Sequence, residues 1–167
     1  ELSYLHPNYY TPNKEVLKDL GVTPDEKYVL VRFIALNATH DIGNKGIPTK
    51  KKIEAVKTLA KYAKVFISSE GTLPQELEQY RLKTRPEQIL DVMAFASIVW
   101  GESITIPAEA AVLGVPALNN NNMKSYYLID EQDNYGLCYC YKGNEEELNQ
   151  ALQKCIELLK RDKQKNR

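Results

Sequence analysis

YVLVRFI at residues 28–34 is a nearly continuous run of β-branched, aromatic and other apolar side chains. Such a run is typical of a strand that is buried on both faces, as in a parallel sheet. A polar loop follows, and then a helix is predicted at 50–63, with Ile53, Val56 and Ala60 on one face. KVFISS at 64–69 predicts the next strand. The order strand, helix, strand indicates a βαβ unit.

The same alternation continues along the chain. Apolar runs predict further strands at 81–83, 97–100, 115–118 and 137–141, with helices at 71–80, 86–96, 107–113 and 144–160 between or after them. The sequence therefore predicts an α/β fold, a Rossmann-like, doubly wound and mostly parallel sheet of about six strands. The domain is predicted to span 25–160, after an ordered lead-in segment with a short helix at 1–24 and before a frayed tail at 161–167.

The composition excludes several classes of function. Among 167 residues there are 22 Lys and Arg and 22 Asp and Glu, so the chain has no general attraction for nucleic acid or an anionic membrane. No apolar run approaches the roughly 20 residues of a membrane-spanning helix. The three cysteines have no zinc-site spacing, and we expect a reduced, cytoplasmic protein without a metal or cofactor. The chain begins at Glu1 rather than Met, so we expect a mature form or a fragment of a longer protein.

Ligands in doubly wound sheets bind beyond the carboxyl ends of the strands, so the loops there hold the candidate site residues. The strongest candidate segment is WGESITIPAEAAVLGVPAL at 100–118. Ser103 and Thr105 precede a predicted helix, whose N-terminal N–H groups favour a phosphate. Glu109 lies about one turn inside, where its carboxylate could accept hydrogen bonds from two sugar hydroxyls. The alternative is that Ser103 or Thr105 only caps the helix and that Glu109 is solvated.

The loop after the first strand contains His40 together with Asn37 and Asp41. A His–Asp pair can orient an imidazole for proton transfer or for a phosphate contact, so His40 is the candidate catalytic residue. The alternative is a turn stabilised by Asp41, with a solvated His.

Three other features have both a functional and a structural interpretation. Ser69, Glu70 and Gly71 end the second strand, and Glu70 could bind sugar hydroxyls or favour the start of the next helix by its charge. Arg81 begins the strand predicted at 81–83, where it could contact a ligand or lie solvated at an edge. The three lysines at 50–52 could attract a phosphate or a membrane, but a solvated helix face is the favoured interpretation. The four asparagines at 119–122 are interpreted as a polar turn.

The pattern GES-x-T-x-x-x-E-A-A-x-L-G-x-P-A resembles the donor-binding segment of GT-B glycosyltransferases and of non-hydrolysing UDP-N-acetylglucosamine 2-epimerases. By this resemblance, Glu109 matches the ribose-binding Glu, and Ser103, Ile104 and Thr105 match the phosphate loop. Glu102, in the same motif, is a further binding candidate. The epimerases have consecutive glycines where this chain has Ile104 and Thr105.

A wider resemblance includes YLHPNYYTP, VRFIALNATHDIGNKGI, KVFISSEGTLP and YRLK together with the GES segment. In this order they resemble a prokaryotic family of predicted glycosyltransferases, which look like GT-B proteins of two Rossmann-like halves. This chain resembles only the C-terminal half, which in GT-B enzymes binds the nucleotide-sugar donor. GT-B chemistry generally needs no bound metal, and the arginine at 81 matches a position that often contacts the base.

The resemblance implies the donor-binding half of a glycosyltransferase of glycan or polysaccharide synthesis, with a nucleotide-diphosphate sugar, most plausibly a UDP-sugar, as the donor. A missing N-terminal domain would bind the acceptor and could place the protein at the periphery of the inner membrane. We expect the isolated half to be inactive. Two alternatives stay open: half of a nucleotide-sugar 2-epimerase-like enzyme, and a non-catalytic Rossmann-like binding or interaction domain.

Overall fold

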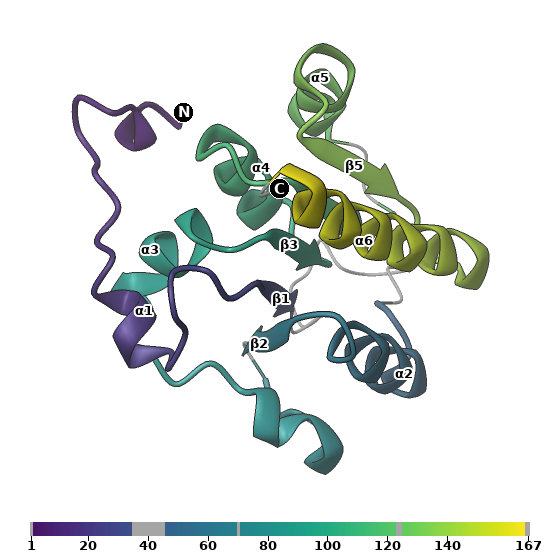
Figure 1. Cartoon of the computed structure of the whole chain (residues 1–167). Helices are drawn as coiled ribbons and strands as arrows, with labels where there is room; N and C mark the ends of the chain where they lie inside the picture. Colours follow the sequence, from purple (N-terminus) through teal and green to yellow (C-terminus); the bar gives the residue numbers. More distant parts are fainter. Residues whose placement is uncertain (1, 35–45, 70, 123–124, 166–167) are drawn as a thin grey trace.

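The fold is that of a computed structural model which describes residues 2–34, 46–69, 71–122 and 125–165. Five parallel strands form one sheet in the order β2-β1-β3-β4-β5 (Figure 1). The strands are β1 Tyr28–Phe33, β2 Lys64–Ser69, β3 Ile98–Gly101, β4 Ala117–Asn120 and β5 Cys138–Tyr141. The predicted Rossmann-like α/β fold is therefore confirmed. In this order β2 lies on one side of β1, and β3, β4 and β5 follow one another on the other side. Rossmann-like sheets bind ligands beside the strand at which the order switches in this way.

Helices cover both faces of the sheet (Figure 1). Helices α2 and α6 pack on one face, whereas α1, α3 and α4 pack on the other, and α5 lies against β5 and α4. The α-helices are α1 Val16–Asp19, α2 Thr49–Leu59, α3 Ile89–Ala94, α4 Thr105–Val112, α5 Tyr126–Tyr135 and α6 Glu145–Lys165. Three short 3-10 helices, η1 Ser3–Leu5, η3 Gln75–Tyr80 and η4 Pro86–Gln88, complete the described elements.

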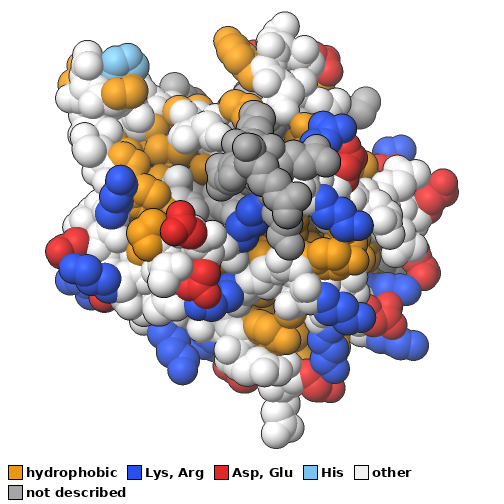
Figure 2. All heavy atoms as spheres, viewed as in Figure 1, with side chains coloured by type: hydrophobic (Ala, Val, Ile, Leu, Met, Phe, Trp, Pro, Cys, Tyr) orange, Lys and Arg blue, Asp and Glu red, His pale blue; other side chains and the backbone are white. Residues whose placement is uncertain are grey.

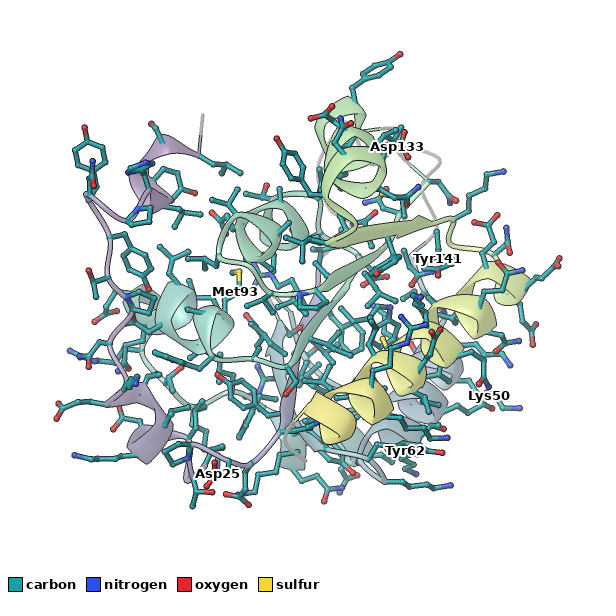
Figure 3. All side chains as sticks on the ribbon, turned by 45° about the horizontal axis from the view of Figure 1, so that its top comes forward. Asp25, Lys50, Tyr62, Met93, Asp133 and Tyr141 are labelled. Carbon is teal, nitrogen blue, oxygen red and sulfur yellow. The ribbon has the colours of Figure 1, made fainter. Side chains whose placement is uncertain are left out.

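Both faces of β1 are buried, which explains its continuous apolar sequence. Val29 and Val31 pack under α2 and α6, whereas Tyr28 and Leu30 pack on the α3 side, as the alternation of side chains along a strand requires. Figure 3 shows Met93 on the inner side of α3, where it joins the second of these two cores. The parallel sheet is thus enclosed between two apolar layers.

The strand predicted at 81–83 is wrong, and the sheet has five strands rather than six. Arg81 forms only an isolated bridge with Ile67, and the Leu82 N–H donates to the Ile67 carbonyl at 2.8 Å. The 3-10 helices η3 and η4 lie on either side of this bridge, and Pro86 begins the second one. Between two such tight turns the chain stays extended for only a few residues, too few for a ladder.

The predicted polar loop at 119–122 is also wrong in part, because β4 extends to Asn120. Asn119 and Asn120 are 3% and 2% exposed, and their polarity is satisfied by hydrogen bonds. Asn120 Oδ1 accepts from the Trp100 indole N–H at 2.7 Å, and Asn120 Nδ2 donates to the Lys142 carbonyl at 3.0 Å. Buried amides with such partners can occupy a strand end at no large cost.

Helix α5 was not predicted. Among its side chains that the structure describes, only Leu128 is buried, so the apolar periodicity that reveals a helix is nearly absent. The last helix, α6, extends to Lys165, within the segment for which a frayed tail is predicted. At the other end, the lead-in segment is anchored by buried Leu5 and by the Tyr10 hydroxyl, which donates to Asp91 Oδ1 at 2.6 Å.

The surface has no strong charge of one sign on the face shown in Figure 2, where Lys and Arg are interspersed with Asp and Glu. This agrees with the neutral overall composition. None of the helices in the described ranges combines the length and the apolar character that crossing a bilayer requires.

Candidate functional site

The carboxyl ends of all five parallel strands lie on one edge of the sheet. Gly101 ends β3 there, beside Arg32 of β1. A Cβ atom at position 101 would lie 2.1 Å from the Arg32 carbonyl oxygen, so only glycine fits. The Glu102 N–H donates to the same carbonyl at 3.2 Å. The chain therefore leaves β3 in close contact with β1 before it enters α4.

The first turn of α4 contains no acidic side chain, and the positive end of its dipole is therefore open to a negative group. Ser103 lies just before this helix, and its Oγ accepts a long hydrogen bond of 3.4 Å from the Ile106 N–H. The Ser103 carbonyl accepts from Asn119 Nδ2 at 2.5 Å, which ties the loop to the end of β4. This arrangement allows both interpretations of Ser103, because a weak cap leaves room for an anion at the helix start.

Glu102 is the most buried charged residue of the edge, at 2% exposure. Its Oε1 accepts from the Ile47 N–H at 2.6 Å, and its Oε2 lies 2.8 Å from Lys52 Nζ. The Glu102 carbonyl accepts from Asn121 Nδ2 at 2.6 Å. The carboxylate thus joins the loop after β3 to the residue just before α2 and to the first turns of that helix.

The lysine run at 50–52 is not a uniform solvated face, as the sequence favoured. Lys52 is only 17% exposed, pairs with Glu102 and lies 4.6 Å from the centre of the Phe33 ring. Lys51 lies 2.7 Å from Glu145 of α6, whereas the side chain of Lys50 is exposed (Figure 3). Partners on other elements explain a basic first turn that would otherwise oppose the helix dipole.

Glu109 lies on α4, one turn inside the helix as predicted, but its carboxylate already has a partner. The Tyr4 hydroxyl of the lead-in segment donates to Glu109 Oε1 at 2.5 Å. This hydrogen bond raises the pKa of Tyr4 to about 12, with smaller contributions from partial burial and from the negative charge of Glu109. A phenol O–H therefore occupies the position at which a sugar hydroxyl could donate.

A cavity of about 360 Å³ opens at the edge between the ends of β1 and β2, the 81–89 segment and the first turn of α4. We call it the arginine cavity, because three arginines line it beside serine and threonine side chains. Its polar lining residues are Arg32, Ser68, Ser69, Arg81, Thr84 and Arg85. Leu82, Ile89 and Ile106 supply apolar walls.

The polar groups of the arginine cavity differ in how they are bonded. Arg32 Nη1 donates to Ser68 Oγ at 2.7 Å. Arg81 makes a two-pronged ion pair with Glu78, both contacts at 2.8 Å, and this guanidinium holds the pKa of Glu78 below its ordinary value. Thr84 Oγ1, in contrast, is buried and has no hydrogen-bond partner among the described residues. An unpartnered buried hydroxyl in a cavity wall is costly unless a water molecule or a bound group satisfies it.

Four of the predicted site residues, Asn37, His40, Asp41 and Glu70, lie outside the described residues. The other predicted residues fall into two neighbouring groups. Ser69, Gly71 and Arg81 lie at and after the end of β2, where Ser69 Oγ bonds to the Gly71 backbone, and both Ser69 and Arg81 line the arginine cavity. Ser103, Ile104, Thr105 and Glu109 lie along the start of α4, with Glu102 buried behind them.

Four polar residues of the arginine cavity were not among the predicted site residues, namely Arg32, Ser68, Thr84 and Arg85. Arg32 had a visible signal, since it is the only charged residue of the apolar run at 28–34. A charge inside a buried strand needs a partner or a ligand. Thr84 and Arg85 had no comparable signal, because both occur in an ordinary polar turn. In the portions of the chain that the structure describes, no group of His, Cys, Asp or Glu could hold a metal ion.

Neither a protein-family model nor a curated protein sequence matches this chain. Solved structures do match its fold. A protein classed as a UDP-N-acetylglucosamine 2-epimerase from Listeria monocytogenes matches with a TM-score of 0.61 and 12% identity, over 95% of this chain and 43% of its own. The UDP-GlcNAc 2-epimerase of Methanocaldococcus jannaschii matches with a TM-score of 0.58 and 16% identity, over 84% of this chain and 42% of its own. The glycotransferase of kitacinnamycin matches with a TM-score of 0.53 and 13% identity, over 82% of this chain and 35% of its own.

The chain has the fold of one part of a GT-B protein. It spans less than half the length of these three structures. At such low identities the likeness concerns the fold alone, and it confirms the predicted GT-B-like resemblance at that level.

Proposed function

We propose that this chain binds a nucleotide-diphosphate sugar as the donor-binding part of a GT-B-like glycosyltransferase. The observation that supports this best is the arginine cavity, with its unpartnered Thr84 hydroxyl, beside the first turn of α4. The two features lie at the carboxyl edge of the sheet, where Rossmann-like folds bind nucleotides.

The nucleoside would occupy the arginine cavity. Its volume of about 360 Å³ lies within the range of roughly 300–1,000 Å³ that is usual for small-molecule sites. Arg32 and Arg81 offer N–H donors for the carbonyl oxygens of a base, and Leu82 and Ile89 offer apolar contact for its ring. Because uracil presents carbonyl oxygens, we propose a UDP-sugar as the donor.

The diphosphate would bind at the start of α4, with Ser103, Ile104 and Thr105 supplying N–H and hydroxyl donors. Glu109 would then accept hydrogen bonds from the ribose hydroxyls in place of the Tyr4 hydroxyl. The ribose hydroxyls would replace the bond from Tyr4, so the exchange needs only the displacement of the exposed Tyr4 side chain. Glu102 would support this loop through Lys52 and Ile47 rather than touch the ligand.

Transfer of the sugar would require an acceptor held by a further domain, the N-terminal domain of the GT-B architecture. His40, with Asn37 and Asp41, stays our candidate for proton transfer, and Glu70 and Gly71 for sugar contacts, on the ground that they follow β1 and β2 at the same edge.

Calorimetric titration of the chain with UDP, and with ADP and GDP for comparison, tests the proposal. Thr84→Val removes the unpartnered hydroxyl while keeping the side-chain shape, and the loss of one hydrogen bond should weaken UDP binding about 5-fold. Thr58→Val is the matched control, because Thr58 bonds within α2 and does not line the cavity. Glu109→Ala should weaken UDP binding as well, whereas Tyr4→Phe should strengthen it.

Two results would contradict the proposal. One is the lack of saturable binding of any nucleotide at millimolar concentration. The other is UDP binding that neither Thr84→Val nor Glu109→Ala changes. If a longer form of the protein converts UDP-N-acetylglucosamine into its 2-epimer without transferring the sugar, the donor site belongs to an epimerase-like enzyme instead.

A further inference from the structure

A strap of chain, residues 2–13, lies across the outside of α4 and α3 before the chain enters α1 (Figure 1). Its anchor is on α3. Asp91 Oδ1 accepts from the Tyr10 hydroxyl at 2.6 Å and from the Asn13 N–H at 2.9 Å. Both donors belong to the half of the strap that is nearer to α1, so this half is fixed to the domain at one point.

The other half of the strap ends on α4. We call residues 2–5 the strap end, and it contains η1. Leu5 is buried, and Leu2 packs against a small apolar cluster whose buried members are Ala108, Leu128 and Cys138. Ile104, which directly precedes α4, packs against the same cluster. The strap end therefore shares its apolar support with the start of α4.

Tyr4 lies between these two leucines, and its hydroxyl donates to Glu109 Oε1 at 2.5 Å. A phenol O–H donates to a carboxylate as a ribose hydroxyl does, so the two compete for one acceptor. The phenol has the advantage of a tether, which gives it a high effective concentration at Glu109. Because the Tyr4 side chain is 46% exposed, the contact can be broken without opening a core.

Side chains, rather than backbone bonds, hold the strap end on α4. Within the described ranges, the backbone–backbone hydrogen bonds of residues 2–12 all stay inside the strap, such as that from the Leu5 N–H to the Leu2 carbonyl at 3.0 Å. Segments with few backbone bonds to the rest of a protein separate from it at a low cost in free energy. The strap end can therefore leave α4 while the Asp91 anchor holds.

We propose that the strap end is an intramolecular competitor of the nucleotide, which covers the start of α4 in the free chain and swings away about the Asp91 anchor when the ribose binds Glu109. This regulation rests on the proposed function. That function requires only the Tyr4 side chain to move, whereas here η1 carries Tyr4 and both leucines away as one unit. Because the strap end and the nucleotide exclude each other, each weakens the binding of the other by the same factor.

Calorimetric titration with UDP tests the competition. Tyr4→Phe removes the bond to Glu109 and should tighten UDP binding about 5-fold. Leu2→Ala removes apolar contact from the strap end without touching Glu109, and it should tighten UDP binding about 3-fold. Tyr9→Phe is the control, because Tyr9 is exposed and lies outside the strap end, and it should leave the affinity unchanged. In a Glu109→Ala background, Tyr4→Phe should give no gain.

Amide hydrogen exchange, followed by NMR, shows whether the strap end moves. The Leu5 and His6 N–H groups bond to the carbonyls of Leu2 and Ser3. UDP should reduce their protection, because a single 3-10 turn is not stable once it leaves its support. The Asn13 N–H, which belongs to the anchor, should keep its protection.

Several results would overturn the proposal. If UDP binds equally well to the wild type, Tyr4→Phe and Leu2→Ala, the competing strap is refuted and the nucleotide site stands. A gain from Tyr4→Phe alone, with unchanged exchange at Leu5 and His6, would show that only the Tyr4 side chain gives way. Slower exchange at these two amides would show that the strap closes on the ligand instead. If no nucleotide binds to any of these proteins at millimolar concentration, the proposed function fails, and the strap is rejected with it because it has no ligand to exclude.

Discussion

Replacing Lys52 with Met should lower the free energy of unfolding by about 3–5 kcal/mol, because it leaves a buried carboxylate without its counter-charge. The side chains of Glu102 and Lys52 are 2% and 17% exposed, and their charged atoms lie 2.8 Å apart. At that distance and an effective dielectric constant of about 20, the attraction is about 6 kcal/mol. This attraction offsets the cost of removing both charges from water. In the Lys52→Met variant the Glu102 carboxylate is still buried, but no attraction offsets the cost of its burial.

Urea unfolding, followed by the fluorescence of the single buried Trp100, measures the effect. Glu102→Gln keeps an oxygen for the Ile47 N–H, so the double variant with Lys52→Met should lose only about 1–2 kcal/mol. For Lys52→Met alone, Tm should fall by about 10 °C. Lys50→Met, on the exposed side of the same turn, is the control and should change stability by less than about 0.5 kcal/mol.

A cost below about 1 kcal/mol for Lys52→Met, together with an equal cost in the double variant, would refute the reasoning. It would mean that Glu102 does not depend on Lys52. The loop before α4 would then be held by its backbone contacts and by the amides of Asn119 and Asn121.

Two further predictions concern the same edge of the sheet. Gly101→Ala should cost at least about 2 kcal/mol in urea unfolding, since its Cβ would collide with the Arg32 carbonyl, whereas Gly71→Ala, with no atom within 4 Å of the added Cβ, should cost less than about 0.5 kcal/mol. The pKa of Tyr4 lies near 12 instead of 10.0, so the Tyr4–Glu109 bond should stabilise the fold fully below about pH 10 and less as the pH rises toward 12. The difference in phenolate absorbance between the wild type and Tyr4→Phe reports the titration of Tyr4, and it should titrate near pH 12. The same difference, measured between proteins that both carry Glu109→Ala, should titrate near pH 10. A value near pH 10 in both pairs would show that the bond does not form.

Local sequence patterns predicted the elements that have strong apolar periodicity. The run at 28–34 became β1 because burial on both faces leaves a continuous apolar signature. The segment at 64–69 became the edge strand β2, in which buried side chains alternate with more exposed ones. The sequence patterns did not predict elements that bury few side chains or that bury polar ones. Helix α5 buries one described side chain, and β4 ends in two asparagines whose hydrogen-bond partners lie on other elements.

The sequence predicted which residues lie at the carboxyl edge of the sheet, but not the partners that they meet there. The position of the strand ends led to Ser69, Arg81, Ser103 and Glu109, and their ligand roles stay predictions. The partner of Glu109 could not be predicted, because Tyr4 precedes it by 105 residues and the lead-in segment meets α4 only in the folded chain.

The sequence by itself determined the alternation of strands and helices, the glycine at the end of β3 and the helix start that follows it. These are local properties, set by side-chain shape and by the period of burial. Only the tertiary structure decided which distant groups meet, such as Arg32 with Ser68 and Lys52 with Glu102. Contacts of this kind depend on the order and register of the strands, which neighbouring residues in the chain do not specify.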